Sequence, residues 1–288
     1  MKLLHFSDVH VQLPDWRTRP LRQLGALRAL ATVELWKGRG KAYDDAADKL
    51  AAIARDADDL RADHCLCTGD LTQLGMAEEF ALARRALGPL AGDAERFTAI
   101  AGNHDRYHPG LPHFEEHFPE QDRSDLPGAL RVRLLGEVAL ICLESPPSPS
   151  WPVLAHGRVL PAELAALRLM LARPELRSRC ALVLVHHAPM RVHRAPIPWV
   201  QGAPTPDWPW HGLRGGRELL AACAEGGVQA VLCGHVHDRF DLPAAPGRAR
   251  VICAGSSTER GHEGYWELEV QGARLVRASK RHIGGAPA

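Results

Sequence analysis

Five short polar clusters in the sequence contain side chains that commonly bind divalent metal ions. They are Asp8-Val9-His10, Gly69-Asp70, Gly102-Asn103-His104-Asp105, His186-His187 and Gly234-His235-Val236-His237. A mixture of imidazole and carboxylate ligands favours a transition metal such as Mn, Fe or Zn over Ca or Mg, which prefer oxygen ligands. Two such ions about 3.5–4 Å apart need a bridging ligand, and a carboxylate with two oxygens is the natural one. The clusters therefore indicate a transition-metal site, in which two ions would share a carboxylate.

Each cluster directly follows a short apolar stretch that we predict to be a β-strand. The predicted strands cover residues 2–7, 65–68, 97–101, 138–143, 181–185, 230–233 and 251–254. Ligands of an open sheet bind at the carboxyl ends of its strands, so we expect the five clusters to converge on one site.

The spacing within the clusters predicts how their side chains point. Asp8 and His10 are two residues apart, as are His235 and His237. On nearly extended backbone, both side chains of such a pair would face the same way. The glycines that precede Asp70, Asn103 and His235 suit a sharp turn or a close backbone approach where a strand stops.

Helical patterns lie between the predicted strands. Apolar residues recur at helical spacing in residues 44–60, 76–90 and 162–171, and residues 265–270 and 274–276 read as a β-hairpin. Strands that alternate with helices are typical of an α/β fold. We treat 1–288 as one domain, with residues 14–40 and 188–216 as two insertions that exceed ordinary loop length.

The order of the clusters resembles that of the calcineurin-like binuclear metallophosphoesterases, from Asp8 to His237. The resemblance implies a four-layer sandwich of two mixed β-sheets flanked by helices, with the metals where the sheets meet. It also implies two metal ions that share Asp70 as a bridge. The other ligands would be Asp8, His10 and His237 for the first ion, and Asn103, His186 and His235 for the second.

The same resemblance implies a catalytic mechanism. A metal-bound hydroxide would attack phosphorus, and His104 would face the substrate and protonate the leaving alkoxide, with Asp105 orienting its ring. We predict Arg106, His187 and Trp199 as substrate contacts. The sequence departs from the family at Glu144-Ser145, where Asp or Asn is more usual.

Each cluster also has a purely structural interpretation. Asp-x-His and Gly-Asp occur in ordinary surface turns, and His186-His187 could be one core imidazole beside an exposed one. Five clusters in this order favour the metal site. The histidines outside the clusters, such as His5 and His64, have no partner at ligand spacing and are interpreted as structural or surface residues.

A second, narrower resemblance concerns the substrate. Residues 35–40 (Leu-Trp-Lys-Gly-Arg-Gly), Asp63-His64, residues 68–72 (Thr-Gly-Asp-Leu-Thr) and Glu79-Phe80 look like the calcineurin-like UDP-diacylglucosamine pyrophosphatases of lipid A synthesis. This implies cleavage of a pyrophosphate in a lipid-linked sugar nucleotide. The alternative is a phosphodiesterase that acts on cyclic nucleotides or glycerophosphodiesters.

Composition limits the other function classes. Lys and Arg (35) nearly balance Asp and Glu (34), which disfavours a nucleic-acid partner and a nuclease. A non-catalytic scaffold is disfavoured because every ligand position is filled. The odd number of cysteines, 7, most of them in or beside apolar stretches, and an N-terminus without signal-peptide character predict a cytoplasmic protein. Oligomeric state is left open.

The two insertions carry most of the tryptophans. Leu21–Trp36 has an apolar helical pattern, and Trp199–Trp210 contains three tryptophans. Helix packing is one interpretation of the first stretch. The other is a cap over the metals that admits an acyl chain and rests peripherally on the inner membrane surface.

Overall fold

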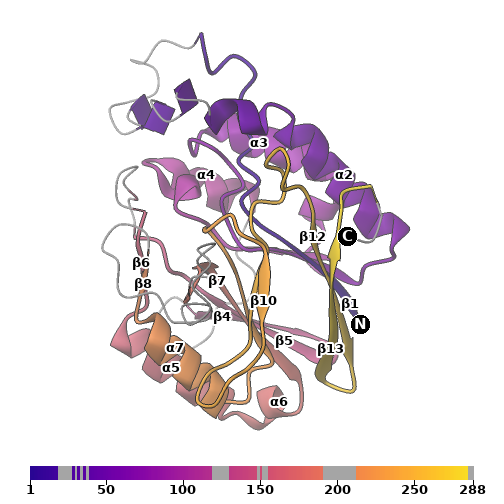
Figure 1. Ribbon diagram of the computed structural model, residues 1–288, viewed down its shortest axis with the longest axis vertical. Helices are drawn as coiled ribbons and strands as arrows, with labels where there is room; N and C mark the ends of the chain where they lie inside the picture. Colours follow the sequence, from indigo (N-terminus) through magenta and orange to yellow (C-terminus); the bar gives the residue numbers. More distant parts are fainter. Residues whose placement is uncertain are drawn as a thin grey trace, which may run out of the picture.

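The computed structural model describes residues 1–18, 28–29, 31–32, 35–36, 39–118, 130–147, 150, 155–190 and 212–284. Within these ranges the chain forms two large β-sheets that pack face to face, with helices on both outer faces (Figure 1). This arrangement confirms the predicted α/β fold with two mixed sheets flanked by helices. No helix in the described ranges is long and apolar enough to cross a membrane.

The first sheet has the strand order β13-β12-β1-β2-β3. Strands β1, β2 and β3 are parallel, and β12 and β13 complete the sheet as an antiparallel hairpin. The predicted hairpin is thus confirmed, although its second strand is longer than expected. The bounds are β1 (Lys2–Phe6), β2 (His64–Cys67), β3 (Phe97–Ala99), β12 (Tyr265–Gln271) and β13 (Arg274–Arg281).

The second sheet has the order β10-β11-β9-β7-β5-β4, with a parallel centre and antiparallel edges. Its strands are β4 (Leu130–Leu135), β5 (Val138–Leu143), β7 (Cys180–His187), β9 (Ala230–Gly234), β10 (Phe240–Leu242) and β11 (Val251–Cys253). The sequence analysis missed β4 because Arg131 and Arg133 alternate along it like exposed residues. Both are buried, and they donate hydrogen bonds to backbone carbonyls of the first sheet's edge strand. Two short strands, β6 (Gly157–Arg158) and β8 (Leu213–Arg214), pair separately.

Three apolar cores separate the layers. Helices α2 (Ala46–Asp59), α3 (Ala77–Leu87) and α4 (Gly110–His117) cover the first sheet, and Leu50 and Phe80 pack on Phe6 there. Helices α5 (Pro161–Leu171), α6 (Pro174–Arg177) and α7 (Gly216–Glu225) lie on the second sheet. Leu66 and Leu182 belong to the core between the sheets. All seven cysteines are buried thiols, which confirms the prediction for the six that lie in or beside predicted strands and adds Cys223 on α7.

The described part of the insertion 14–40 contains a small satellite core. Leu35 is 1% exposed and packs with Trp16 and Met76, whereas its neighbour Trp36 is 62% exposed. Part of the leucine stripe is therefore core, as the helix-packing interpretation expects. Leu21, Leu24, Leu27 and Leu30 lie outside the described residues, as do Trp199, Trp208 and Trp210, so the cap over the metals stays a prediction.

Two buried ionisable residues, Arg28 and Glu79, hold the loop between β2 and α3. Arg28, from the insertion, donates hydrogen bonds to the carbonyl oxygens of Leu74 (2.8 Å), Gly75 and Tyr107 (3.5 Å). Glu79, in the first turn of α3, accepts from the backbone N–H groups of Leu74 and Met76 at 2.8 and 3.2 Å. Together they fix the loop residues that follow Asp70.

The burial of Glu79 predicts a pH-dependent stability. Burial raises the pKa of this carboxyl to about 8, although the loop N–H groups and Arg28 oppose the change. Between the unfolded value of about 4.3 and this value, the folded protein holds a proton that the unfolded chain has released. The free energy of unfolding should therefore fall as pH rises through this window.

Replacement of Glu79 by Gln removes the titrating group and keeps a hydrogen-bond acceptor for the loop. Relative to the wild type, Glu79→Gln should gain a few kcal/mol of stability between pH 5 and 8, since one pKa unit is worth about 1.4 kcal/mol. Urea unfolding of both metal-free proteins at the two pH values measures this gain. Parallel losses in the two proteins would show that Glu79 is ionised throughout.

Candidate metal centre

The five clusters converge where the carboxyl ends of the two sheets meet. Asp8 and His10 follow β1, Asp70 follows β2, and Asn103 lies in the loop after β3. His186 is the next-to-last residue of β7, and His235 and His237 follow β9. The ligand atoms of Asp8, His10 and His237 form one group and those of Asp70, His186 and His235 form a second, and the atoms of each group lie within 4.8 Å of one another. A third group of the same size, His10, Asp70 and His104, overlaps both. The structure thus brings together the side chains that the sequence analysis predicted to meet.

The backbone at these residues is left-handed, not extended. Among the described residues, 7 that are not glycine have positive φ, and 5 of them are predicted ligands: Asp8, His10, Asp70, His235 and His237. The extended conformation predicted for the Asp-x-His and His-x-His pairs is therefore wrong, because β1 and β9 end before the first ligand. Asp and His are among the residues that tolerate this conformation best, but it still costs free energy. The side chains converge because the chain turns sharply after each strand.

Two glycines leave room for the aspartates. A Cβ atom on Gly102 would collide with the backbone and carboxylate of Asp70, and one on Gly234 would collide with Ser7 and the carboxylate of Asp8. The close approach that the sequence analysis predicted for these glycines is confirmed. Any side chain at either position would push a carboxylate out of the site.

The first group of ligand atoms joins Asp8, His10 and His237. The Nε2 atoms of the two histidines are 3.2 Å apart, and Asp8 Oδ1 lies 3.4 Å from His237 Nε2 and 3.8 Å from His10 Nε2. The other oxygen, Oδ2, accepts a hydrogen bond from the backbone N–H of His235 at 2.8 Å. Three ligand atoms therefore surround one point from different sides.

The second group joins Asp70, His186 and His235, with Asn103 beside them. Asn103 Oδ1 is 3.0 Å from both His186 Nε2 and His235 Nδ1. Asp70 Oδ2 lies 3.4 Å from His186 Nε2 and 4.0 Å from His10 Nε2, so it stands between the two groups. This is the position that a bridging carboxylate must occupy.

These residues fit divalent cations. Asp8 Oδ1 is buried and has no hydrogen-bond partner among the described residues, although two imidazole nitrogens face it. For metal–ligand bonds of about 2.1 Å, neighbouring ligand atoms lie about 3.0–3.4 Å apart. Most of the observed separations fall close to this range. A cation in the first group would satisfy the lone pair of Asp8 Oδ1, which no hydrogen bond from the described residues satisfies.

The protein's own charges support the same conclusion. Burial acts to raise the pKa of Asp70, but His186, His104 and His10 hold it well below its usual range. Burial acts to lower the pKa of His186, yet Asp70 and Asp8 raise it to about 9. Asp70 thus stays ionised inside the protein, as a carboxylate metal ligand must, and a bound cation would replace the proton that its charge favours on His186.

His104 lies at the edge of the first group, where its ring centroid is 4.6 Å from that of His10. Its Nδ1 atom is 2.7 Å from the carbonyl oxygen of Gln73, so Nδ1 must carry the donated proton. The role predicted for Asp105 is not confirmed. Its carboxylate accepts from the backbone N–H groups of Gly102 and Leu71 and from both donors of Thr72, and so ties together the two ligand loops.

Arg106 is also placed differently from the prediction. Its side chain is buried, forms an ion pair with Glu144 and donates a hydrogen bond to the carbonyl oxygen of Pro146. Burial of a guanidinium requires such a partner, and Glu144, the departure from the family pattern, supplies it. Arg106 therefore anchors the loop after β5, which argues against the predicted substrate contact.

The other two predicted substrate contacts have different outcomes. His187 is fully buried, with Nδ1 2.9 Å from Ser145 Oγ and its ring centroid 4.2 Å from that of His235. Burial, and then the neighbouring imidazoles, hold its pKa well below the usual range, so it is neutral. Its ring packs against the rings of the ligand residues His186 and His235. The predicted contact with substrate is corrected, because the side chain is not exposed. Trp199 lies outside the described residues.

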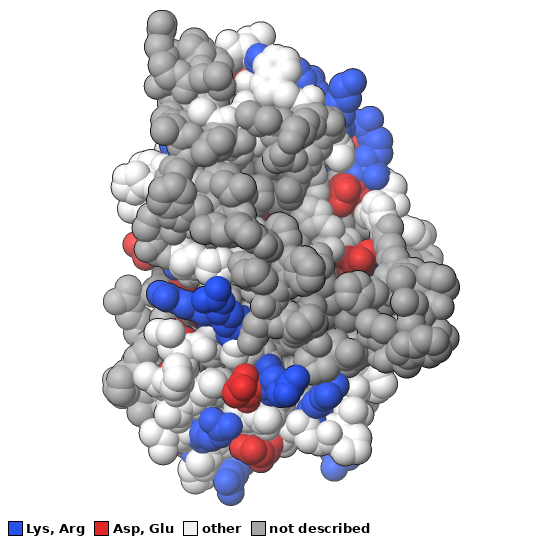
Figure 2. Space-filling view, turned by 60° about the vertical axis from the view of Figure 1, so that its left-hand side comes forward, with Lys and Arg blue, Asp and Glu red and all other residues white. Residues whose placement is uncertain are grey.

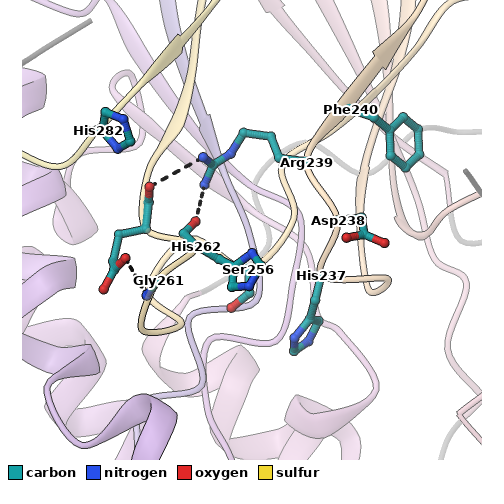
Figure 3. Close-up of a pocket in the computed structure, with 9 residues that line it drawn as sticks. His237, Asp238, Arg239, Phe240, Ser256, Gly261, His262 and His282 are labelled. Carbon is teal, nitrogen blue, oxygen red and sulfur yellow. Dashed lines mark hydrogen bonds between the residues drawn. The ribbon is translucent and has the colours of Figure 1, made fainter. Parts of the chain in front are cut away.

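The sequence analysis missed three residues of the site. Tyr43 Oη and Glu259 Oε2 are each 3.1 Å from His237 Nδ1, and Ser256 Oγ donates a hydrogen bond to the carbonyl oxygen of Asp8 at 2.8 Å. A pocket of about 430 Å³ opens beside His237 (Figure 3). Its further lining residues include Arg239, His262 and His282. The only sequence signal for Ser256 and Glu259 is the run Gly-Ser-Ser-Thr-Glu that follows β11. Such a run is common in loops and does not by itself predict a functional site.

Comparison with known proteins identifies the arrangement. The family model described as calcineurin-like phosphoesterase matches residues 1–239 of the chain. This match contains all seven predicted metal ligands and His104. A search of curated proteins found no match.

Solved structures share the fold at low sequence identity. A dimetal phosphatase from Danio rerio has 14% identity and a TM-score of 0.64, covering 98% of this chain and 95% of its own. A purple acid phosphatase from yellow lupin seeds has 12% identity and a TM-score of 0.64, covering 100% of this chain and 52% of its own. A sulfate thiohydrolase from Thermus thermophilus has 17% identity and a TM-score of 0.51, covering 99% and 56%. The chain thus spans about half of the lupin and Thermus proteins, and these likenesses show a shared fold.

Proposed function

The chain belongs to the calcineurin-like phosphoesterase family, and we propose that this metal-dependent phosphoesterase cleaves a phosphodiester or a pyrophosphate bond. The observation that carries the proposal is the position of Asp70 Oδ2 between two groups of ligand atoms. A carboxylate between two cation sites is the arrangement that two-metal hydrolysis requires.

The roles of the residues follow from their placement. Asp8, His10 and His237 would hold the first cation, and Asn103, His186 and His235 the second, with Asp70 serving both. Bound cations would polarise the phosphoryl oxygens and lower the pKa of a coordinated water. The chain contributes a fixed set of ligands, braced by Asp105, which connects the loops that carry Asp70 and Asn103.

His104 is the residue that we propose for proton transfer. Its Nδ1–H donates to the carbonyl oxygen of Gln73, which fixes the ring orientation. Protonation therefore occurs at Nε2, and the imidazolium can deliver that proton to the oxygen of a leaving alkoxide. The Gln73 carbonyl takes the orienting role that the sequence analysis gave to Asp105.

We propose Mn as the first metal to test, with Fe and Zn as alternatives. The groups of ligand atoms contain imidazole nitrogens and carboxylate oxygens and no thiolate. This donor set suits all three ions and is less suited to Ca, which prefers oxygen ligands only.

The substrate of this site can be found by a direct screen. Mn-loaded protein would be incubated with cyclic nucleotides, glycerophosphodiesters and UDP-linked acyl sugars, and the products would be identified by mass spectrometry. Cleavage of any of these that disappears after chelation and returns with added Mn supports the proposed function. Failure of the metal-loaded protein to cleave every phosphodiester and pyrophosphate would refute it.

A lipid-linked sugar nucleotide, such as UDP-diacylglucosamine, is a second proposal for the substrate. It is supported by the exposed indole of Trp36 in the insertion 14–40 (62% exposed), next to the buried Leu35. An indole has one apolar and one polar end, so at a surface it suits contact with an acyl chain or a membrane boundary. Such contact would place the protein peripherally on the inner membrane surface.

Trp36 allows a sharp test of this second proposal. Trp36→Ser should raise KM for a UDP-linked acyl sugar several-fold, because the apolar contact contributes about 1–2 kcal/mol. It should leave cleavage of a small soluble phosphodiester unchanged. Leu169→Ser is the matched control, because Leu169 is equally exposed (62%) but lies on α5. An unchanged KM in Trp36→Ser, or an equal rise in both variants, would contradict acyl recognition.

Nucleic acid is the partner that the net charge favours least. In Figure 2, Lys and Arg side chains in the lower part of the visible face lie among Asp and Glu side chains, and a further row of Lys and Arg side chains lies at the upper right. The whole sequence carries a formal net charge of only +1. Affinity for nucleic acid depends mainly on neutralisation of phosphates by clustered basic residues. We therefore propose a small or lipid-linked phosphate ester as substrate.

A further inference from the structure

The segment 256–259 lies beyond the part of the chain that the family model matches, yet it is built into the metal centre. Ser257 N donates to the carbonyl oxygen of Ser7 at 2.9 Å. Ser256 Oγ and Thr258 Oγ1 donate to the carbonyl oxygens of Asp8 and Val9 at 2.8 and 2.5 Å. The segment therefore runs along the strained turn that carries Asp8. Glu259 is the next residue.

His237 uses its two ring nitrogens on opposite sides. Nε2 faces the first ligand group, 3.2 Å from His10 Nε2 and 3.4 Å from Asp8 Oδ1. Nδ1 faces away from it and lies 3.1 Å from Glu259 Oε2 and 3.1 Å from Tyr43 Oη. Only one of these nitrogens carries a proton in the neutral imidazole, so the neighbours of Nδ1 decide which one coordinates.

The neighbours of Nδ1 favour a proton at that atom. An ionised carboxylate can only accept, so Glu259 requires Nδ1–H. The Ser256 hydroxyl donates its proton to the carbonyl oxygen of Asp8, so its oxygen is left as an acceptor, and Tyr43 Oη lies 3.1 Å from it. Tyr43 Oη can therefore donate its proton to Ser256 Oγ, and His237 Nδ1–H can donate to the carboxylate of Glu259. His186 follows the same pattern, because its Nδ1 is 2.8 Å from the carbonyl oxygen of Thr68.

We propose that Glu259 is a positioning residue for the first metal ion: its carboxylate accepts the Nδ1 proton of His237 and thereby presents Nε2 of His237 to the ion. A carboxylate in this place also makes the imidazole a stronger ligand, and loss of such a partner typically weakens metal binding about 10–100-fold. The inference rests on the proposed binuclear site and adds a residue that the ligand motifs do not contain.

The loop around Glu259 is held by independent contacts. Arg239 donates a hydrogen bond to the carbonyl oxygen of His262 at 2.9 Å, as Figure 3 shows. It donates a second one to the carbonyl oxygen of Glu263 at 3.4 Å. Lys49 Nζ bonds to the carbonyl oxygen of Thr258 and to the carboxylate of Glu263, at 2.9 Å each. Replacement of the Glu259 side chain therefore leaves the loop with its other attachments.

Metal titration of purified metal-free protein tests the proposal. Mn²⁺ binding would be followed by calorimetry and by electron paramagnetic resonance for the wild type, Glu259→Gln and Glu259→Leu. We expect Glu259→Leu to weaken one of two binding steps about 10–100-fold and to leave the other unchanged. Glu259→Gln should lose less, because its amide oxygen can still accept the Nδ1 proton. Nitrogen-15 NMR of the wild type should show His237 protonated at Nδ1, and Glu259→Leu should lose this preference.

Glu263→Gln is the matched control. It removes the same charge from the same loop, but the carboxylate of Glu263 contacts Lys49 and the backbone N–H of Gly261 instead of His237. Unchanged Mn²⁺ binding in both Glu259 variants, or equal weakening in Glu263→Gln, would overturn the proposal. A wild-type protein that binds no Mn²⁺, Fe²⁺ or Zn²⁺ would refute the proposed function itself, which the wild-type titration alone reveals. If Glu259→Leu does not fold, Glu259→Gln and the tautomer measurement decide.

Discussion

Asp70→Asn should lose affinity for both metal ions and almost all activity. Asp70 Oδ2 stands between His10 and His186, and Oδ1 accepts a hydrogen bond from the backbone N–H of His104 at 2.7 Å. Asn has the same shape and tolerates the φ of 53° at this position, so the exchange changes charge and leaves the backbone in place. We expect kcat to fall at least about a thousandfold, since the bound cations contribute several kcal/mol to transition-state stabilisation.

Elemental analysis of the dialysed proteins measures this effect. The wild type should retain close to two ions per chain, Asp70→Asn close to none, and His237→Asn one. Asp241→Asn is the control, because Asp241 forms an ion pair with Arg250 on the edge of the second sheet. Full metal content and activity in Asp70→Asn would show that the two groups do not share this carboxylate.

His104→Ala should impair catalysis according to the leaving group. If His104 protonates the leaving oxygen, its loss should slow cleavage of an alkyl ester about 10²–10⁴-fold, the usual range for general acid catalysis. A nitrophenyl ester needs little proton transfer and should be affected much less. Comparison of kcat on the two substrates measures the difference. Equal losses on both would point to charge stabilisation instead.

The metal content of His104→Ala distinguishes a general acid from a metal ligand, which the structure also allows. A ring nitrogen of His104 lies within 4.8 Å of ligand atoms of His10 and Asp70, so His104 could itself be a metal ligand. A general acid predicts that His104→Ala keeps both ions, whereas a ligand predicts that one is lost. His113→Ala, on the outer helix α4, provides a control for the removal of a nearby imidazole.

The predicted ligands could be found from the sequence because each cluster is local. Asp70 and His186, for example, are placed by the strand that precedes each of them, and the ends of parallel strands meet at one edge. The backbone conformation at Asp8 and His10 could not be found in the same way. The rule that residues two apart share a face holds only within a strand, and β1 ends at Phe6.

Contacts between distant segments were beyond the reach of sequence patterns. Glu259 meets His237 across a loop, and Tyr43 reaches the same imidazole from 194 residues away. Arg106 looked like a phosphate contact because it follows the His104-Asp105 pair. Whether a charge is open to substrate depends on its partner, and no local pattern pairs Arg106 with Glu144.

The left-handed backbone at the five ligand positions limits which residues this site can evolve to use. Side chains with branched β-carbons are strained at positive φ, whereas Asn, Asp, His and Gly are tolerated. Exchange among Asp, Asn and His would therefore alter the charge and softness of the ligand set with little change in the turns. Metal preference could drift between related enzymes through such exchanges, while Leu, Val or Ile at these positions would require a new turn. In this protein the backbone turns therefore fix where the ligands lie, and the side-chain types on those turns set which ion they prefer.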